Sequence, residues 1–290
     1  MDWVPLFFID AVCHQLKLES FDEVSELSAG WSEFGAEHRE KRREFAFFCR
    51  VDGKESSYAI EESRKPWTIW LLAAELNLKF DRIRSVSCNS WEYFPNRVSM
   101  DEFKRNVLPT VSSLVVGCEW GYLYPKFSAR NQILFEAFKN SPGFNYINVQ
   151  EQGEESQDFV TRQVELGNVR ILTLNARLAV KWPKAKKIAK TLHIFVNSSR
   201  FHSLKHYGSL PNDAELFALF LERALAGELK RGAFIWLRHI TYAKSQMIGS
   251  LHPDCRDYSK KDEWIAWRIP NSNLRILLRQ NYKTLWMGVQ

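Results

Sequence analysis

Two histidines one helical turn apart, His202 and His206, form the clearest pair of potential metal ligands in this sequence of 290 residues. On a helix, both imidazoles would lie on one face and could bind one metal ion. The pair lacks the glutamate of the zinc-protease motif, and the sequence suggests no third ligand. We therefore expect no metal site here and interpret the two histidines as paired surface residues.

The other combinations of reactive side chains are weaker. Cys13 and His14 are neighbours on a short predicted helix, where their side chains diverge and cannot easily share a proton. His252 and Cys255 flank a Pro-Asp pair that favours a loop. The sequence contains no glycine-rich phosphate loop, Gly-x-Ser-x-Gly elbow or dinucleotide motif. We expect neither catalytic residues nor a cofactor, so the chain is predicted not to be an enzyme.

Cysteine usage and composition bound the class of protein. The five cysteines are widely spaced and contain no Cys-x-x-Cys, which argues against a disulfide framework or a thiolate zinc site and favours the cytoplasm or nucleus. The content of 45% hydrophobic residues is ample for a folded core. We expect no membrane-spanning segment and no secretory signal. The net charge of +6 permits acidic partners without identifying a nucleic-acid binder.

The strongest local charge feature is the lysine-rich stretch 181–190, which has five lysines and no acidic residue. With Ile188 and Leu192 turned inward on a helix, the lysines would form one exposed face. Such a face could bind phosphate groups, with Trp182 available for stacking. The simpler interpretation, which we favour, is a solvated helix face.

The N-terminal stretch from Val4 to Phe34 has apolar residues at helical spacing, with a polar break at 17–20. The two series are Phe8, Val12 and Leu16, then Phe21, Val24 and Leu27, with Trp31 at the end. Positions three and four apart define one helix face, so the spacing predicts two or three short helices. Ser20 with Glu23 predicts a capping box at the second helix. Helices this short are unstable alone, so they form either a corner of a larger domain or a docking element for a partner.

This pattern resembles an F-box, the helical module that docks substrate receptors onto the adaptor of cullin–RING ubiquitin ligases. Pro5 and Trp31 are 26 residues apart, as in the family pattern. The resemblance implies that the following residues bind the adaptor: Pro5, Phe8, Val12, Leu16, Leu18, Phe21, Val24, Leu27 and Trp31. The opening Asp-x-Val-Pro and the segment with Trp31-Ser32, His38 and Arg42 are similar to the F-box-associated families that are expanded in nematodes.

The next segment, 41–80, is predicted to contain a β-hairpin. Apolar residues alternate from Phe45 to Val51, Asp52-Gly53 supplies a turn, and Tyr58 with Ile60 continues the return strand. Residues 67–78 are apolar enough to be buried, either as a helix or as a helix followed by a strand.

From residue 81 to 262, strand and helix signals alternate. The predicted strands are Ile83–Cys88, Leu114–Cys118, Phe144–Val149, Val169–Leu174, Leu192–Val196 and Phe234–Ile240. Helix starts are predicted near Ser99, Ser156 and Asn212, and helix ends at Gly143, Gly167 and Gly227. This alternation predicts parallel strands with helical crossovers. The strand spacing is near the leucine-rich-repeat period of about 20–29 residues, and residues 169–175 resemble the repeat core.

The last segment, 263–290, changes to period-two alternation interrupted by turns, which predicts a three-stranded antiparallel cap. The sequence thus predicts an α/β protein: an F-box-like helical module (1–40), a β-hairpin and connecting segment (41–80), irregular leucine-rich-repeat-like βα repeats (81–262) and the cap (263–290). An ordinary open α/β sheet is the competing architecture for the repeats.

These features favour a non-catalytic protein-interaction receptor. The resemblance implies a substrate-recognition subunit of a cullin–RING, or SCF-type, ubiquitin ligase. Its N-terminal module would bind the ligase adaptor, and its repeats would bind an unknown protein target. The alternatives are a βα-repeat interaction scaffold without a ligase role and, with less support, a basic RNA-binding protein. We expect no membrane partner.

Overall fold

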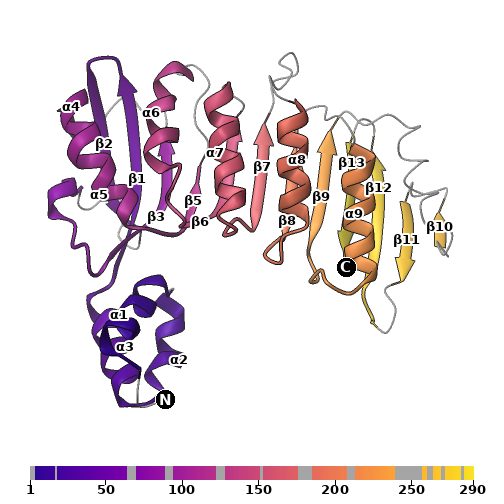
Figure 1. The fold of residues 1–290 in the computed structure, drawn as a ribbon, viewed down its shortest axis with the longest axis horizontal. Coiled ribbons are helices and arrows are strands. Elements are labelled where there is room, and N and C mark those ends of the chain that lie inside the picture. The colour runs from indigo at the N-terminus through magenta and orange to yellow at the C-terminus, as the bar shows by residue number, and fades with distance from the viewer. Residues whose placement is uncertain are drawn as a thin grey trace. The chain divides into compact units, whose positions relative to one another are not determined.

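The computed structural model describes residues 4–16, 18–63, 70–88, 94–121, 128–150, 153–175, 185–207, 213–238, 257–259, 264–268, 272–281 and 284–290. The chain forms two compact units, Met1–Phe144 and Asn145–Gln290. The predicted segments 1–40 and 41–80 both belong to the first unit. Both units are α/β, as expected from the sequence, and each contains a sheet of mixed parallel and antiparallel strands (Figure 1).

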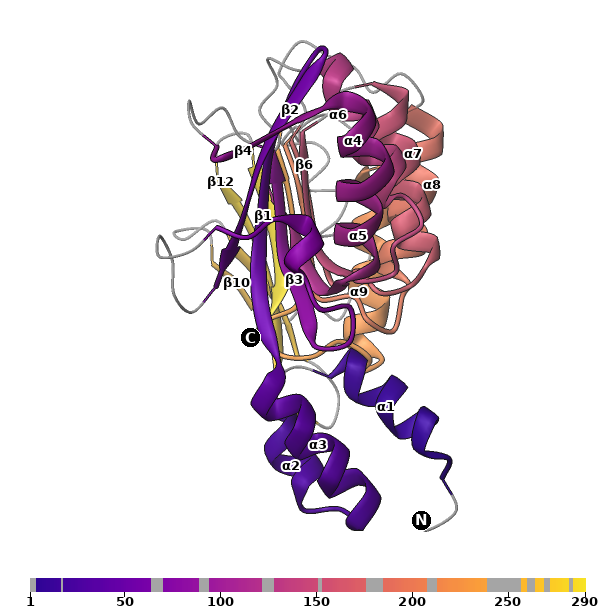
Figure 2. The same cartoon turned by 90° about the vertical axis from the view of Figure 1, so that its left-hand side faces the viewer.

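The first unit begins with short helices that match the predicted apolar series. These are α1 (Leu6–Gln15), the 3₁₀ turn η1 (Leu18–Ser20), α2 (Phe21–Ser25) and α3 (Ala29–Lys41). The second helix starts where Ser20 predicts, but the expected capping box is absent because the Ser20 side chain accepts no hydrogen bond at this helix end. Together the helices form a three-helix corner that leads into the first strand (Figure 2).

The sheet of the first unit has the order β5-β3-β1-β2-β4. Its strands are β1 (Arg43–Asp52), β2 (Glu55–Glu62), β3 (Asp81–Cys88), β4 (Asn96–Ser99) and β5 (Val115–Trp120). Parallel pairs join β1 to β3 and β3 to β5, whereas β1–β2 and β2–β4 are antiparallel. The helical elements are η2 (Ala73–Glu75), α4 (Met100–Glu102), the π-helical turn η3 (Phe103–Val107), α5 (Leu108–Ser113) and α6 (Ser128–Phe138).

Two details of this unit differ from the sequence expectations. The hairpin is present, but Asp52 pairs with Glu55, so the turn is centred on Gly53 and Lys54. Gly53 has φ +69°, a conformation that glycine adopts at little cost. The segment 67–78 is not a buried helix in its described part, which begins at residue 70: Ala73–Glu75 form only a 3₁₀ turn, and Trp70 and Leu78 are exposed.

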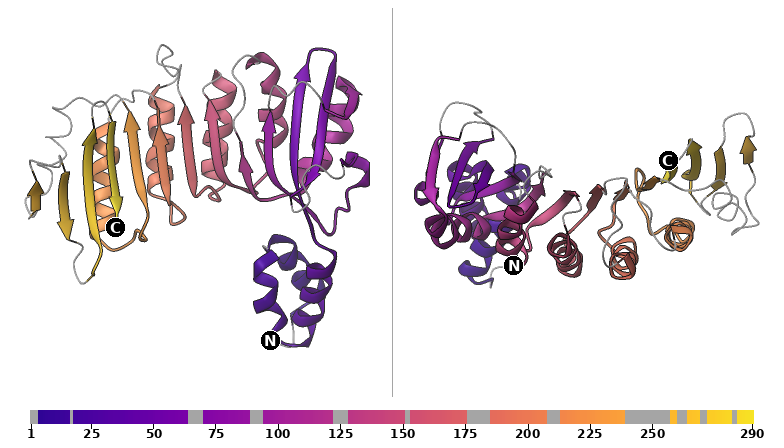
Figure 3. Two further views of the ribbon diagram at one scale, coloured as in Figure 1. Left: turned by 180° about the vertical axis from the view of Figure 1, so that it is seen from behind. Right: turned by 90° about the horizontal axis from the view of Figure 1, so that it is seen from above.

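The second unit is built from successive strand–helix units. Its elements are β6 (Phe144–Gln150), α7 (Glu154–Glu165), β7 (Ile171–Asn175), α8 (Ala185–Val196), β8 (Ser203–His206), α9 (Asp213–Leu225) and β9 (Phe234–Arg238). The strands β6, β7, β8 and β9 are neighbours in chain order and pair in parallel. Seen from above, α7, α8 and α9 all lie on one face of this sheet (Figure 3). One strand face is therefore buried under helices, and alternate residues of each strand form the other face.

The sheet continues with antiparallel strands, as expected for the C-terminal segment. These are β13 (Thr284–Val289), β12 (Arg275–Asn281), β11 (Trp264–Arg268) and the short β10 (Asp257–Ser259). β13 pairs antiparallel with β9, and the remaining strands follow in the order β12, β11, β10. Among the described residues, no helix is long and apolar enough to cross a membrane.

The predicted strand Leu192–Val196 is wrong, because these residues end α8. Ile188, Leu192, Phe195 and Val196 are all buried at helical spacing, and the apolar run at 192–196 was only the end of that face. The strand that occupies this place in the sheet is β8, which sequence reasoning missed. Its Ser-Leu-Lys-His sequence is too short and too polar to give a clear strand pattern.

Candidate protein-docking surface

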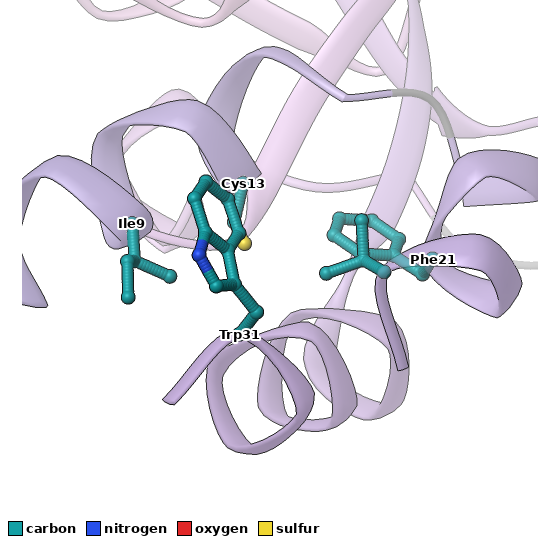
Figure 4. Packing of buried hydrophobic residues seen from close by; sticks show 5 residues of the cluster. Ile9, Cys13, Phe21 and Trp31 are labelled. Atoms are coloured by element: carbon teal, nitrogen blue, oxygen red, sulfur yellow. The ribbon is translucent and has the colours of Figure 1, made fainter. Parts of the chain in front are cut away.

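The N-terminal helices have a small core of their own. Five buried residues from all three helices make up this core: Ile9, Cys13, Phe21, Val24 and Trp31. Figure 4 shows the Trp31 indole beside Cys13, with Ile9 and Phe21 to either side. Burial raises the pKa of the Cys13 thiol, so the thiol is protonated and acts as an apolar core group rather than a nucleophile.

The start of α1 presents large apolar side chains to solvent. Leu6, Phe7 and Phe8 are 59%, 78% and 49% exposed, and Leu27, in the turn before α3, is 47% exposed. We call these four residues the exposed apolar patch. Phe8 also packs edge-on against Trp31, with ring centroids 6.5 Å apart, so the patch is continuous with the core. Leu6, Phe7 and Phe8 are consecutive in the chain, and large exposed apolar side chains that lie together can mark an interaction site.

The structure divides the nine residues implied by the resemblance into three groups. Phe21, Val24 and Trp31 are buried in the helical core. Val12, Leu16 and Leu18 are half-buried, and Pro5, Phe8 and Leu27 are exposed. Sequence reasoning missed Leu6 and Phe7, although the uninterrupted apolar run 6–9 gave a signal. One turn of helix cannot bury all four side chains against a single core, so some must face outward.

His38 connects this helical corner to the segment before β3. Its buried ring stacks on Phe21 at 6.0 Å and meets the edges of His14 at 5.1 Å and Phe80 at 5.3 Å. Its Nε2 lies 2.8 Å from the Asp10 carboxylate. A single residue of α3 therefore contacts α1, α2 and the chain that enters the sheet.

Two buried arginines hold the C-terminal end of α1. Arg42 donates to the carbonyls of Cys13 at 2.7 Å and Leu16 at 3.1 Å, and Arg82, in β3, donates to the carbonyl of His14 at 2.9 Å. The Cys13 carbonyl also accepts from the Leu16 amide at 3.3 Å, and a cation beside these carbonyls complements the helix dipole. Burial lowers the pKa of both guanidinium groups to about 10, so both stay charged at neutral pH.

Asp10, His14 and His38 bring three ligand-type atoms within 4.8 Å of one another, a cluster that sequence reasoning did not find. The hydrogen bonds argue against a metal here. Arg42 can only donate, and its Nη2 lies 3.2 Å from His38 Nδ1, so that nitrogen must accept. Nε2 of a neutral His38 then carries the proton and donates to Asp10. Neither ring nitrogen has a lone pair left for a metal ion.

The protonation of this cluster follows from burial and its cationic neighbours. Burial, with the nearby Arg82 charge, lowers the pKa of His14 to about 4. Burial also lowers the pKa of His38, although the hydrogen bond to Asp10 opposes this effect. Burial tends to raise the pKa of Asp10, but the bond to His38 and the neighbouring cations outweigh it and leave the pKa lowered. At neutral pH the cluster is an aspartate with two neutral histidines.

The histidine pair of the second unit does not have the expected geometry. His206 is buried in β8 and His202 precedes that strand, so the two are not one helical turn apart. Residues four apart in extended chain are separated by about 13 Å, too far to share a metal ion. The interpretation as two surface histidines is also wrong for His206. His252 and Cys255 lie outside the described residues.

The lysine-rich stretch is described only from residue 185, where α8 begins. Ile188 and Leu192 are buried, as predicted, while Lys187 and Lys190 are exposed. Lys187 forms an ion pair with Asp158 of α7. This pairing favours the interpretation as a solvated helix face that also joins neighbouring helices.

The fold and the site define an α/β protein with a helical N-terminal corner that carries exposed apolar side chains. No protein-family model matches the chain, and no curated protein sequence matches it either. The assignment of a function therefore depends on the geometry and on the resemblance of the N-terminal motif.

Proposed function

We propose that this protein is a non-catalytic substrate receptor of a cullin–RING ubiquitin ligase. The observation that carries the proposal is the exposed apolar patch on a helical module with its own core. The F-box-like helices would bind the ligase adaptor, and the α/β remainder would bind a protein target. A receptor of this kind would work in the cytoplasm or nucleus and would need no cofactor.

The energetics support a docking role for the patch. Covering a Phe or Leu side chain contributes roughly 1.5–3 kcal/mol, so the four residues together could supply much of an interface. The exposed surface of these residues gains nothing from the helical core, although Phe8 also packs on Trp31. Three of the residues implied by the resemblance, Phe21, Val24 and Trp31, would then position the helices rather than contact the adaptor.

The second unit fits the target-binding half of the proposal. Its strands β6 to β9 follow one another in chain order with all three helices on one face, which supports the interpretation of this part as leucine-rich-repeat-like βα repeats. The antiparallel strands after β9 would act as its cap. Such an array offers an extended face to a protein rather than an enclosed pocket to a small molecule.

The direct test is capture of the purified adaptor by the purified chain. The double variant Leu6→Ser/Phe7→Ser should weaken capture by at least about thirtyfold, since the loss of even one hot-spot side chain costs about 2 kcal/mol or more. Leu78→Ser is the matched control, because Leu78 is 61% exposed in the same unit and lies outside the patch. Undiminished capture by the double variant would show that the adaptor does not bind this surface.

A second candidate function is a βα-repeat scaffold whose N-terminal helices serve only as a cap. The contacts of His38 and Arg82 favour it, because they tie the helices to the β3 region. This alternative predicts that substitutions in the exposed apolar patch do not weaken the binding of any partner. It also predicts that removal of the helices exposes apolar sheet core and causes aggregation.

A further inference from the structure

The second unit has a sheet face that no described helix covers. Seen from behind, in the left panel of Figure 3, no helix lies in front of the strands β6 to β9 and β13. The helices α7, α8 and α9 lie on the opposite face of the sheet. Leu172, Leu204 and Ile235 are buried on the covered face, and the uncovered face also has small buried polar residues, Thr173 and Ser203. The residues that alternate with Leu172, Leu204 and Ile235 along each strand form the uncovered face.

The centre of this uncovered face is aromatic. Trp236 and Trp286 are direct register partners across β9 and β13. Tyr207 packs on Trp236 with ring centroids 4.5 Å apart, and Phe234 stacks on Trp286 at 6.5 Å. All four rings are half-buried. We call them the aromatic platform.

A glycine shapes the platform. A Cβ atom at Gly288 would lie 2.4 Å from the Trp286 ring and 3.1 Å from Phe234. The Trp286 ring therefore occupies the space that a side chain at position 288 would fill.

The charge on these strands has one sign. Apart from the three-residue β10, the strands of this unit contain five basic residues and no Asp or Glu; the basic residues are Lys205, Arg238, Arg268, Arg275 and Arg279. The Lys205 ammonium lies 5.5 Å from the centre of the Phe234 ring, and Arg275 is exposed at the start of β12. Lys205 and Arg275, whose side chains are described, lie on the same sheet face as the aromatic platform, and we call them the basic rim. Basic residues beside an aromatic centre are complementary to an acidic partner.

We propose that the aromatic platform and its basic rim bind an acidic segment of a polypeptide, and that this segment belongs to the target of the receptor. The identification of the occupant as the target rests on the proposed function; the binding itself does not. The ring arrangement favours a polypeptide over stacked nucleic-acid bases. Tyr207 and Trp236 pack at 53° to each other, and the Phe234 ring already carries a lysine, so these rings do not offer parallel open faces to bases.

The test is selection from a random peptide library displayed on phage, with the full-length chain as bait and no ligase adaptor present. Enriched sequences should contain Asp or Glu next to an apolar residue. Synthetic copies should bind about tenfold more weakly to Lys205→Glu/Arg275→Glu, since each reversal places like charges together. Lys190→Glu/Arg200→Glu is the matched control: it changes net charge equally at two exposed residues outside the strands and should bind as the original chain does.

Trp236→Ser should also abolish binding while circular dichroism confirms a folded chain. Absence of enrichment, or peptides that bind both charge variants equally, would overturn the proposal. A short unstructured RNA that binds the chain and loses affinity in Lys205→Glu/Arg275→Glu, where no peptide does, would overturn it in favour of nucleic acid. Adaptor capture is measured separately. If the chain captures no adaptor, the peptide result still holds, but the peptide can no longer be identified as part of a ligase target.

Discussion

Arg42 illustrates how a single buried side chain can determine whether the helical corner holds together. Its guanidinium satisfies two carbonyls at the end of α1 and the Nδ1 atom of His38. Burial of a charged group costs desolvation, and here both Nη atoms of Arg42 meet acceptors, whereas its buried Nε has no hydrogen-bond partner among the described residues. Its presence after Trp31 and His38 in the sequence suggested a family resemblance, and the structure gives it a physical role.

We predict that Arg42→Met lowers the free energy of unfolding by roughly 2–4 kcal/mol, because the carbonyls of Cys13 and Leu16 and the Nδ1 atom of His38 each lose a guanidinium donor. Denaturant unfolding followed by circular dichroism measures the loss. Arg39→Met is the matched control: Arg39 pairs with Asp22 at the surface, and its removal should cost less than about 1 kcal/mol. Equal effects of the two substitutions would show that Arg42 does not hold the helix end.

The histidine cluster should make stability depend on pH. In the unfolded chain His14 titrates near its ordinary value of 6.5, whereas in the folded chain its pKa is about 4. Between these values the unfolded state binds more protons, so stability falls as pH decreases from 6.5 towards 4. The lowered pKa of His38 acts in the same direction.

His14→Gln should flatten this dependence, since it removes the group whose pKa in the folded chain is about 4 and keeps a polar side chain. Thermal unfolding at several pH values between 6.5 and 4 gives the slopes. His193→Gln is the control, because His193 is a partly exposed residue of the second unit. If the slope is the same for His14→Gln and the original chain, the cluster does not cause the pH dependence.

At the scale of elements, the close packing of β5 depends on Gly143. A Cβ atom there would lie only 1.9 Å from the Val115 carbonyl oxygen, and the Gly143 carbonyl accepts a hydrogen bond from the Cys118 amide at 2.7 Å. Backbone meets backbone at this point, so no side-chain rotation can relieve the contact.

We predict that Gly143→Ala lowers the unfolding free energy by roughly 1–3 kcal/mol, the usual cost of forcing atoms into a packed site. Gly30→Ala, in α3, serves as the comparison, because the new Cβ atom would lie 3.4 Å from the Ile9 side chain of α1, which is an ordinary contact distance. It should be neutral or stabilising by up to about 1 kcal/mol, as alanine favours helix. Chemical denaturation of both variants tests the difference.

Most elements were predictable because their signals are local. The hairpin, the strands beginning near Ile83, Phe144 and Phe234, and the antiparallel end all follow from alternation and turn residues. Ser99 caps its helix as predicted, by accepting from the Glu102 amide at 3.2 Å. The predictions failed where the local pattern and the tertiary contacts disagree. An apolar run inside α8 has the pattern of a strand, whereas the polar β8 is a strand because its neighbours β7 and β9 pair with it.

The candidate docking surface was predictable only in part. The spacing from Pro5 to Trp31 located the helices, but it could not separate side chains that face the helical core from those that face outward. That separation depends on how α1 crosses α3, which contacts far apart in sequence determine. His38 and Arg82 were not assigned a role for the same reason: their partners lie 28 and 68 residues away.

At the scale of the whole molecule, the two proposed binding surfaces belong to different parts of the chain. The apolar patch lies on residues 6–27, and the aromatic platform lies in the second unit. Because each surface is built on its own core, removal of one should leave the other intact. Deletion of residues 1–42 tests this directly and also separates the receptor proposal from the scaffold alternative.

We predict that the shortened chain remains folded, captures no adaptor and binds the selected acidic peptides unchanged. Arg82 would lose the His14 carbonyl but keep its bonds to the carbonyls of Leu78, Lys79 and Asp81. With the newly exposed Phe80 ring, the stability lost should be roughly 2–3 kcal/mol. Circular dichroism, light scattering and the two binding assays measure these outcomes. The full-length Leu6→Ser/Phe7→Ser variant is the control, because it should lose adaptor capture at unchanged stability. Aggregation of the shortened chain would instead identify the helices as a cap of the sheet.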